Sequence, residues 1–319
     1  MTRARLHTQR GVAVITALLL TTLAITIVAS LFWQQQVQVR SMENQRLQLQ
    51  TKWILRGALD WARLILREDG RFSGVDHMGE PWAVKLAETR LDDYIERDRN
   101  DGDATDAALS GNITDAQARY NLRNLTKADG SLDPFHVKAY QRLLTTLELP
   151  PELAAVTAQA IARDRPAGAP PPAEGGQPVA TEGMPLGLMQ VDDLLSLPGY
   201  TPEIVNKLRD YVVLLPPNER APVNVNTASA EVIAAVIPSM SVGDARSFVL
   251  SRDRAFIQND ADFTTRRNNR ELDRTDAVAL KTSFFFVYGR VRLDRASLQT
   301  LALMQRDNNG ARVVWIREN

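Results

Sequence analysis

The sequence predicts an α+β protein in which a long N-terminal helix packs on a small antiparallel sheet, with a large all-α domain inserted between them. Three features of the sequence predict this fold. An apolar run near the N-terminus continues, without proline, into an amphipathic helical pattern. Residues 282–319 alternate apolar and polar side chains, as half-buried strands do. The region between these two ends shows helical periodicity broken by proline and glycine.

The apolar run predicts a membrane-spanning segment at residues 12–32. These 21 residues carry no charge, and a helix of that length is about 31 Å long, close to the hydrocarbon thickness of a bilayer. A cleaved secretory signal has a shorter apolar core and a small-residue cleavage site, which is not evident here. Arg3, Arg5 and Arg10 precede the run, so the positive-inside rule predicts a cytoplasmic N-terminus.

The helix is expected to continue to about Arg67, because Gln34–Glu68 contains no proline and Gly57 as its single glycine. A mostly apolar stripe recurs there at steps of three and four residues, so it lies on one face of the helix and needs a partner surface. Its members are Leu47, Thr51, Ile54, Ala58, Trp61 and Ile65.

Three antiparallel strands are expected to supply that surface. The first alternates through Phe285, Val287, Val291 and Leu293, and a turn at 294–297 leads into the second at 298–305. Asn309-Gly310 is a hairpin signal before a last strand at 313–316. The two ends of the chain, 33–125 and 282–319, are therefore interpreted as one α/β domain.

The first part of that domain has weaker signals. A short strand is expected near Trp82, a helix at 91–97 and a polar acidic loop at 98–112. The stretch YNLRNL then reads as a turn and a strand, with apolar side chains facing inward. These are Tyr120, Leu122 and Leu125.

Residues 126–281 are interpreted as the inserted helical domain. Helices are expected over 134–165, with an interruption at Pro150-Pro151, and over 271–281. Residues 166–185 are rich in proline and glycine and predict a flexible surface loop.

Residues 191–253 contain two units that resemble helix-hairpin-helix motifs. The first turns at Pro198-Gly199, and the second follows VNVNTA with Thr227 as the expected N-cap of its first helix. Such units bind DNA through backbone N–H groups aimed at phosphates. Ser239 and Met240 stand where close phosphate approach favours glycine, so packing modules are the preferred interpretation. The alternative is a membrane-anchored DNA-binding protein.

Composition excludes several kinds of chemistry. The chain has no cysteine and three histidines, so thiol catalysis and cysteine-ligated metals are impossible. The 38 basic and 38 acidic residues balance, which argues against general attraction to nucleic acid. No nucleophile or phosphate-binding motif stands out, and we expect no enzymatic activity. Asp101, Asp103 and Asp106 are the first candidates for a calcium site, although a solvated loop is the preferred interpretation of this acidic cluster.

The stretch Arg10-Gly11-Val12, followed by an apolar helix that continues as an amphipathic one, resembles the type IV pilin-like proteins called pseudopilins. In that family a prepilin peptidase cleaves after the glycine and methylates the new N-terminus. The resemblance implies a leader at 1–11, cleavage between Gly11 and Val12, and N-methylation of Val12. The fifth mature position, usually Glu, is Thr16 here. The chain lacks this Glu and contains YNLRNL and the inserted hairpin units. In these three features it resembles the type II secretion system protein K family.

That resemblance implies a pilin-like fold and a minor pseudopilin at the tip of the periplasmic pseudopilus, where it initiates assembly and supports protein export across the outer membrane. The implied partners are the I- and J-type minor pseudopilins, the prepilin peptidase, the inner-membrane secretion platform and secreted substrates, with no nucleic acid. The chain would cross the inner membrane once, with its C-terminal domain in the periplasm. No cofactor is required, although calcium sites occur in the family.

Overall fold

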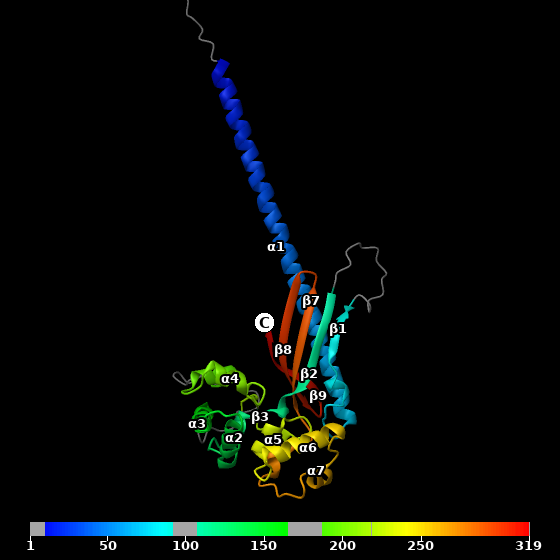
Figure 1. Ribbon diagram of the computed structural model, residues 1–319. Coiled ribbons are helices and arrows are strands. Elements are labelled where there is room, and N and C mark those ends of the chain that lie inside the picture. Colours follow the sequence, from blue (N-terminus) through cyan, green and yellow to red (C-terminus); the bar gives the residue numbers. More distant parts are fainter. Residues whose placement is uncertain (1–9, 92–106, 165–186, 218, 319) are drawn as a thin grey trace, which may run out of the picture.

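The computed structural model describes residues 10–91, 107–164, 187–217 and 219–318 (Figure 1). Its longest element is the helix α1 (Arg10–Phe72), which has 63 residues. The N-terminal half of α1 projects away from the rest of the molecule, and its C-terminal half lies along a sheet. The expected long helix that starts apolar and becomes amphipathic is confirmed, and it ends just before Ser73 and Gly74.

The sheet has five antiparallel strands in the order β1-β2-β7-β8-β9. They are β1 (Leu86–Arg90), β2 (Ala107–Asp115), β7 (Phe284–Leu293), β8 (Ala296–Asp307) and β9 (Gly310–Glu318). The three expected C-terminal strands are confirmed, and Gly310 closes the last hairpin with a positive φ of 136°. Segments from both ends of the chain thus share one sheet.

The prediction of a loop over 98–112 is wrong for its last six residues, because β2 begins at Ala107 and pairs with β7 along its whole length. Ala107, Ala108 and Leu109 are all buried, so this strand lacks the alternation that marks a half-buried strand in sequence. The helix expected at 91–97 lies, from residue 92 on, outside the described residues.

The amphipathic half of α1 packs on the sheet with a face rotated from the expected one. The most buried positions of this face are Thr51, Leu55, Leu59, Ala62 and Leu66. Of the predicted stripe, Thr51 is buried, whereas Trp61 is 48% exposed. Both faces have helical spacing, and only contact with the sheet chooses between them.

The helical region lies beside the end of the sheet where α1 finishes (Figure 1). Its α-helices are α2 (Pro134–Thr146), α3 (Leu153–Asp164), α4 (Pro202–Leu208), α5 (Ala230–Val236), α6 (Val242–Arg254) and α7 (Asp260–Arg266). Its 3₁₀ helices are η4 (Leu122–Leu125), η5 (Val191–Ser196) and η6 (Thr275–Ala277). Two short parallel ladders join distant segments: β3 (Tyr120–Asn121) pairs with β4 (Val212–Val213), and β5 (Val223–Asn224) pairs with β6 (Val278–Ala279).

Three local predictions in this part of the chain need correction. Residues 271–281 form no α-helix, because Val278–Ala279 instead pairs with β5. The strand expected near Trp82 is the 3₁₀ helix η1 (Pro81–Ala83), since a proline in the first turn suits a helical start. The N-cap of α5 is Ser229 rather than Thr227.

The inward positions of YNLRNL are confirmed, because Tyr120, Leu122 and Leu125 are fully buried. The strand itself is only two residues long and turns into η4. The proline- and glycine-rich segment 166–185 lies outside the described residues.

Two glycines give opposite predictions for the same substitution. A Cβ at Gly111 in β2 would collide with the carbonyl oxygen of Tyr288, whereas a Cβ at Gly57 in α1 would meet nothing within 4 Å. Gly111→Ala is expected to lower the free energy of unfolding by about 2 kcal/mol. Gly57→Ala is expected to raise it by about 0.5–1 kcal/mol. Urea denaturation of the full chain in mild detergent, followed by circular dichroism, measures both; equal effects would contradict this account of the sheet.

Candidate functional site

The N-terminal half of α1 exposes its apolar side chains on all sides. It is the one helix of the described residues that is long and apolar enough to cross a membrane, and its most apolar segment is entirely unburied. Leu20 and Phe32, for example, are both 67% exposed. Such a surface requires lipid or the helices of other subunits around it.

The expected processing residues lie at the start of this helix. Gly11 and Val12 both fall in the first turn of α1. The hydroxyl of Thr16 donates to the carbonyl oxygens of Val12 and Ala13, both at 3.0 Å. A threonine here satisfies its own polar group inside the helix, whereas a carboxylate at this depth would need a positive partner. The neighbouring Thr21, Thr22 and Thr26 also donate within α1.

Below the apolar run, α1 also has an exposed apolar outer face, opposite the sheet. We define this outer face as Met42, Leu49, Trp53 and Leu64, which are between 45% and 68% exposed. These positions fall on one side of a helix with 3.6 residues per turn. The outer face therefore continues the apolar surface of the N-terminal half toward the folded domain.

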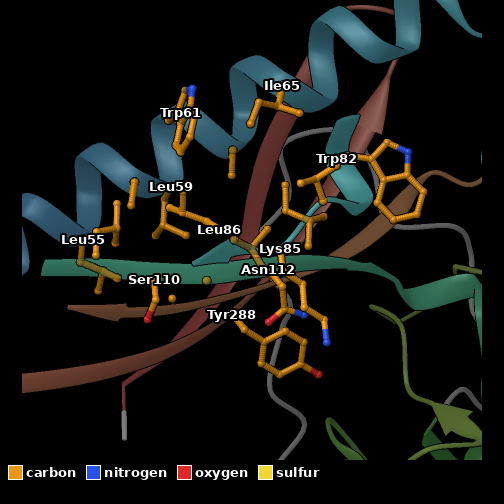
Figure 2. A pocket seen from close by; sticks show the side chains of 18 of the residues that line it. Leu55, Leu59, Trp61, Ile65, Trp82, Lys85, Leu86, Ser110, Asn112 and Tyr288 are labelled. Atoms are coloured by element: carbon orange, nitrogen blue, oxygen red, sulfur yellow. The ribbon is translucent and has the colours of Figure 1, made fainter. Parts of the chain in front are cut away.

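On the sheet side of α1, an apolar groove of about 330 Å³ lies between this helix and the strands β1, β2 and β7. Figure 2 shows Leu55 and Leu59 pointing from α1 toward the sheet, with Trp82 and Leu86 on the opposite wall. Lys85 is the one charged residue among its described lining residues. This lining suits contact with apolar side chains and provides no set of groups for catalysis.

A buried cluster of charges lies where α1 ends. The guanidinium of Arg306 in β8 binds Asp69 at 2.6 Å, contacts Asp76, and donates to the carbonyl oxygen of Thr282 at 3.0 Å. Asp76 also accepts the N–H of Thr282 at 2.7 Å. Glu80 completes the cluster and accepts from the indole of Trp82 at 2.7 Å.

Asp69, Asp76 and Glu80 have carboxylate oxygens close enough to share one cation, within 4.8 Å of one another. Carboxylates are the ligands that calcium takes, but these do not fit a calcium site. Arg306 already binds an oxygen of two of them, and Glu80 accepts from the N–H of His77 as well as from Trp82. The calcium candidates from the sequence, Asp101, Asp103 and Asp106, lie outside the described residues.

Burial dominates the acidity of this cluster. It raises the pKa of Asp69 from 3.8 to about 6, with a further rise from neighbouring Glu80 and an opposing effect of Arg306. The pKa of Asp76 is also raised by burial, although Arg306 and the N–H of Thr282 oppose the rise.

The motif VNVNTA forms a second polar junction rather than a nucleic-acid surface. Asn224 and Thr227 both donate to one carboxylate oxygen of buried Asp115, at 2.8 and 2.6 Å. Asn226 exchanges two hydrogen bonds with the backbone of Ile257. The motif thereby ties β2 to the helical region. The alternation of valine and asparagine was the available sequence signal, but it does not reveal Asp115 as the partner.

The asparagines of YNLRNL have the same role. Asn124 donates to the carbonyl oxygen of Ala221 at 2.8 Å and accepts its N–H at 3.1 Å. Asn121 donates to the carbonyl oxygen of Glu219 at 2.8 Å. These side-chain amides bond the backbone groups of Glu219 and Ala221, which belong to no helix or strand that could bond them.

The geometry of the hairpin units favours packing over DNA binding. At the N-terminus of α6, Asp244 accepts the N–H of Ser241 at 3.1 Å, and Arg270 pairs with the same carboxylate at 2.7 Å. In the first unit, Asp193 accepts the N–H groups of Met189 and Gln190. A phosphate approaching the second hairpin turn would therefore meet a carboxylate, whereas Asp193 caps the start of η5, before the turn of the first unit.

Replacing Asp69 with asparagine is expected to remove one source of pH dependence. Because the folded-state pKa is about 6 and the ordinary value is 3.8, the folded state holds the extra proton between these values. The resulting stabilisation is present below about pH 4 and is lost as the pH rises through about 6, by at most about 3 kcal/mol. The free energy of unfolding of the wild type should therefore fall relative to Asp69→Asn over this range.

Urea denaturation at several pH values between 4 and 7 measures this difference. Asp210→Asn is the matched control, because Asp210 is exposed and should show no such change. A free energy of unfolding of the wild type that stays constant, or rises, relative to that of Asp69→Asn as the pH increases would contradict the prediction.

Comparisons with known proteins agree with this architecture. Family models described as type II secretion system (T2SS), protein K match residues 118–217 and 223–282. The chain is 30% identical over 328 residues to type II secretion system protein K of Pseudomonas aeruginosa, covering 97% of this chain and 92% of the relative. It is 25% identical over 338 residues to the Klebsiella pneumoniae protein of the same name, covering 98% and 97%.

Among solved structures, the chain is similar to one from the crystal structure of the GspK-GspI-GspJ complex of the enterotoxigenic Escherichia coli type 2 secretion system. The TM-score is 0.67 with 18% identity, over 87% of this chain and 99% of that chain. This likeness confirms the predicted fold class. The matched family is a structural component of the secretion system and not a known enzyme family. The relatives and family models together show that the chain belongs to the type II secretion system protein K family.

Proposed function

We propose that this chain is a minor pseudopilin that forms the tip of the periplasmic pseudopilus, initiates its assembly and thereby supports protein export across the outer membrane. The observation that carries this proposal is the position of the helical region. It lies beside the end of the sheet farthest from the membrane-spanning half of α1 (Figure 1). A further subunit stacked above that end would meet the helical region, whereas subunits below have free access to α1.

Thr16 supports the same position. An internal subunit of a pilin-like filament places a charge at the fifth mature position against the N-terminus of its neighbour. A first subunit has no neighbour above it, and a buried carboxylate there would cost free energy without return. The hydroxyl of Thr16, bonded within its own helix, avoids this cost.

The outer face of α1 provides the surface for neighbouring subunits. Trp53 is 68% exposed and Leu64 is 45% exposed on a segment that continues the apolar anchor. The long helices of I- and J-type minor pseudopilins are the partners proposed for it. In this arrangement the N-terminus lies in the cytoplasm, α1 crosses the inner membrane, and the sheet and helical region lie in the periplasm. The role is structural rather than catalytic.

Processing by a prepilin peptidase makes a direct prediction. The protein isolated from membranes should begin at N-methylated Val12, because the peptidase cleaves after the small Gly11. Mass spectrometry of the N-terminal peptide measures this. Gly11→Val should retain the leader, whereas Thr16→Ser should be processed like the wild type. A wild-type protein that retains Met1, or starts beyond residue 30, would contradict the pseudopilin assignment.

Tip location is tested with a single label. Leu250 on α6 is 64% exposed, and the chain has no cysteine, so Leu250→Cys provides one accessible thiol in the helical region. Maleimide-gold on isolated pseudopili should appear at one end of each filament. The cysteine-free wild type controls for background. Labels spread along the filaments would contradict the tip position while leaving the pseudopilin assignment intact.

A further inference from the structure

A second pocket, distinct from the groove beside α1, is lined in part by α7. This helix lies at the end of the molecule away from the N-terminal half of α1 (Figure 1). The pocket encloses about 650 Å³ and is formed by the segment after α1, by α7 and by the segment that leads into β6. Its lining combines apolar side chains, Phe263 and Leu272, with two cations, Arg267 and Lys281. None of these four residues has a role in the anchor, the outer face of α1 or the polar junctions.

Arg267 is the unusual group in this pocket. Its Nε and Nη1 atoms are buried and have no hydrogen-bond partner, and among the described residues no other arginine nitrogen is in this state. Its guanidinium lies over the ring of Phe263, 5.7 Å from the centroid. A buried N–H group without an acceptor is costly, so it marks a place where a partner is missing.

Neighbouring arginines show that acceptors are available elsewhere in this region. Arg266 pairs with Asp262 at 2.7 Å. Arg252 donates to the carbonyl oxygens of Val225 and Ala228 at 2.8 and 2.6 Å. Arg267 is therefore not part of a general excess of positive charge.

The backbone holds Arg267 where it is. The residue is the C-cap of α7, and its N–H donates to the carbonyl oxygen of Phe263 at 3.1 Å. Asn268 and Asn269 follow in the left-handed region, with φ values of 56° and 52°. Their N–H groups donate to the carbonyl oxygens of Thr265 and Thr264 and thereby end the helix. This turn, together with the contact on Phe263, keeps the guanidinium beside the pocket.

The complementary ligand is an anion that carries an apolar group. Two unmet N–H donors of a guanidinium suit an oxygen anion, which reaches them once the atoms that now cover them move aside. Lys281 adds positive charge to the pocket lining. Asp260 also lines the pocket, and its charge disfavours a doubly charged phosphate more than a singly charged carboxylate. Phe263 and Leu272 give the rest of the ligand an apolar surface.

We propose that this pocket binds a carboxylate attached to an apolar group, with Arg267 as its main anchor. Two sources have this chemistry: the carboxy-terminal residue of a peptide and a free small carboxylic acid. A ligand bound there would contact the segment after α1, α7 and the segment before β7 together.

The test uses the full chain in detergent micelles and isothermal titration calorimetry. The probes are 3-phenylpropanoate, the peptide acetyl-Ala-Ala-Phe with a free carboxylate, and the amide of each. The carboxylates are expected to bind at least about tenfold more tightly than their amides, because charge-assisted hydrogen bonds to the guanidinium are lost in the amides. Tighter binding of the peptide than of phenylpropanoate assigns the site to a peptide end, and equal binding assigns it to small acids.

Arg267→Met should lose the preference for the carboxylate, and Arg254→Met, at an exposed arginine at the end of α6, should keep it. Without ligand, the melting temperature of Arg267→Met should equal or exceed that of the wild type, because Nε and Nη1 make no hydrogen bond that could be lost and the methionine can replace the contact with Phe263. A lower melting temperature would point to a structural role and count against the proposal. Equal binding of acid and amide by the wild type, or no saturable binding at about 10 mM, roughly the weak end of specific association, would overturn it. This wild-type comparison decides the matter even if the variant fails to fold.

Discussion

The ion pairs of Arg306 with Asp69 and Asp76 connect the main parts of this molecule. Asp69 belongs to the last turn of α1, Asp76 to the segment after it, and Arg306 to β8. All three side chains are almost fully buried, at 5%, 1% and 3% exposure. Removing one partner of a buried pair leaves an uncompensated charge, which costs far more than the pair itself contributes. The cluster therefore holds the C-terminal end of α1 against β8.

A second junction extends the same logic to the helical region. Asp115 ends β2 and accepts from Asn224 and Thr227, which lie more than a hundred residues later in the chain. Asn224 also donates to the carbonyl oxygen of Asp76 at 3.0 Å. The two junctions thus share Asp76 and join α1, the sheet and the inserted segment into one polar network. Such a network is stabilising only when every member has its partners.

This arrangement places the two surfaces that the proposed tip position requires at opposite ends of the molecule. The N-terminal half of α1 and its outer face present apolar surface for lipid and neighbouring helices. The opposite end presents a folded helical region, in which the N–H of Ser241 in the second hairpin turn is bonded to the carboxylate of Asp244. Because the polar network joins them, a force applied to α1 would be transmitted to the helical region through buried hydrogen bonds rather than through a flexible linker.

The sequence by itself determined the features that depend on local periodicity. The uncharged run at 12–32, the proline-free continuation of α1 and the alternation through Phe285 to Leu293 are each legible within one segment. Thr16 and the Gly11-Val12 pair were also visible, because their meaning depends on distance along the chain from the apolar run.

Only the tertiary structure decided the features that depend on distant partners. The buried face of α1 turned away from Trp61, β2 formed within a stretch that lacks alternation, and Val278–Ala279 paired with β5 instead of forming a helix. The cluster at Asp69 and the missing partner of Arg267 were equally invisible in the sequence. Arg306 is 237 residues from Asp69, and no local pattern reports which charges meet across such a separation once the chain has folded.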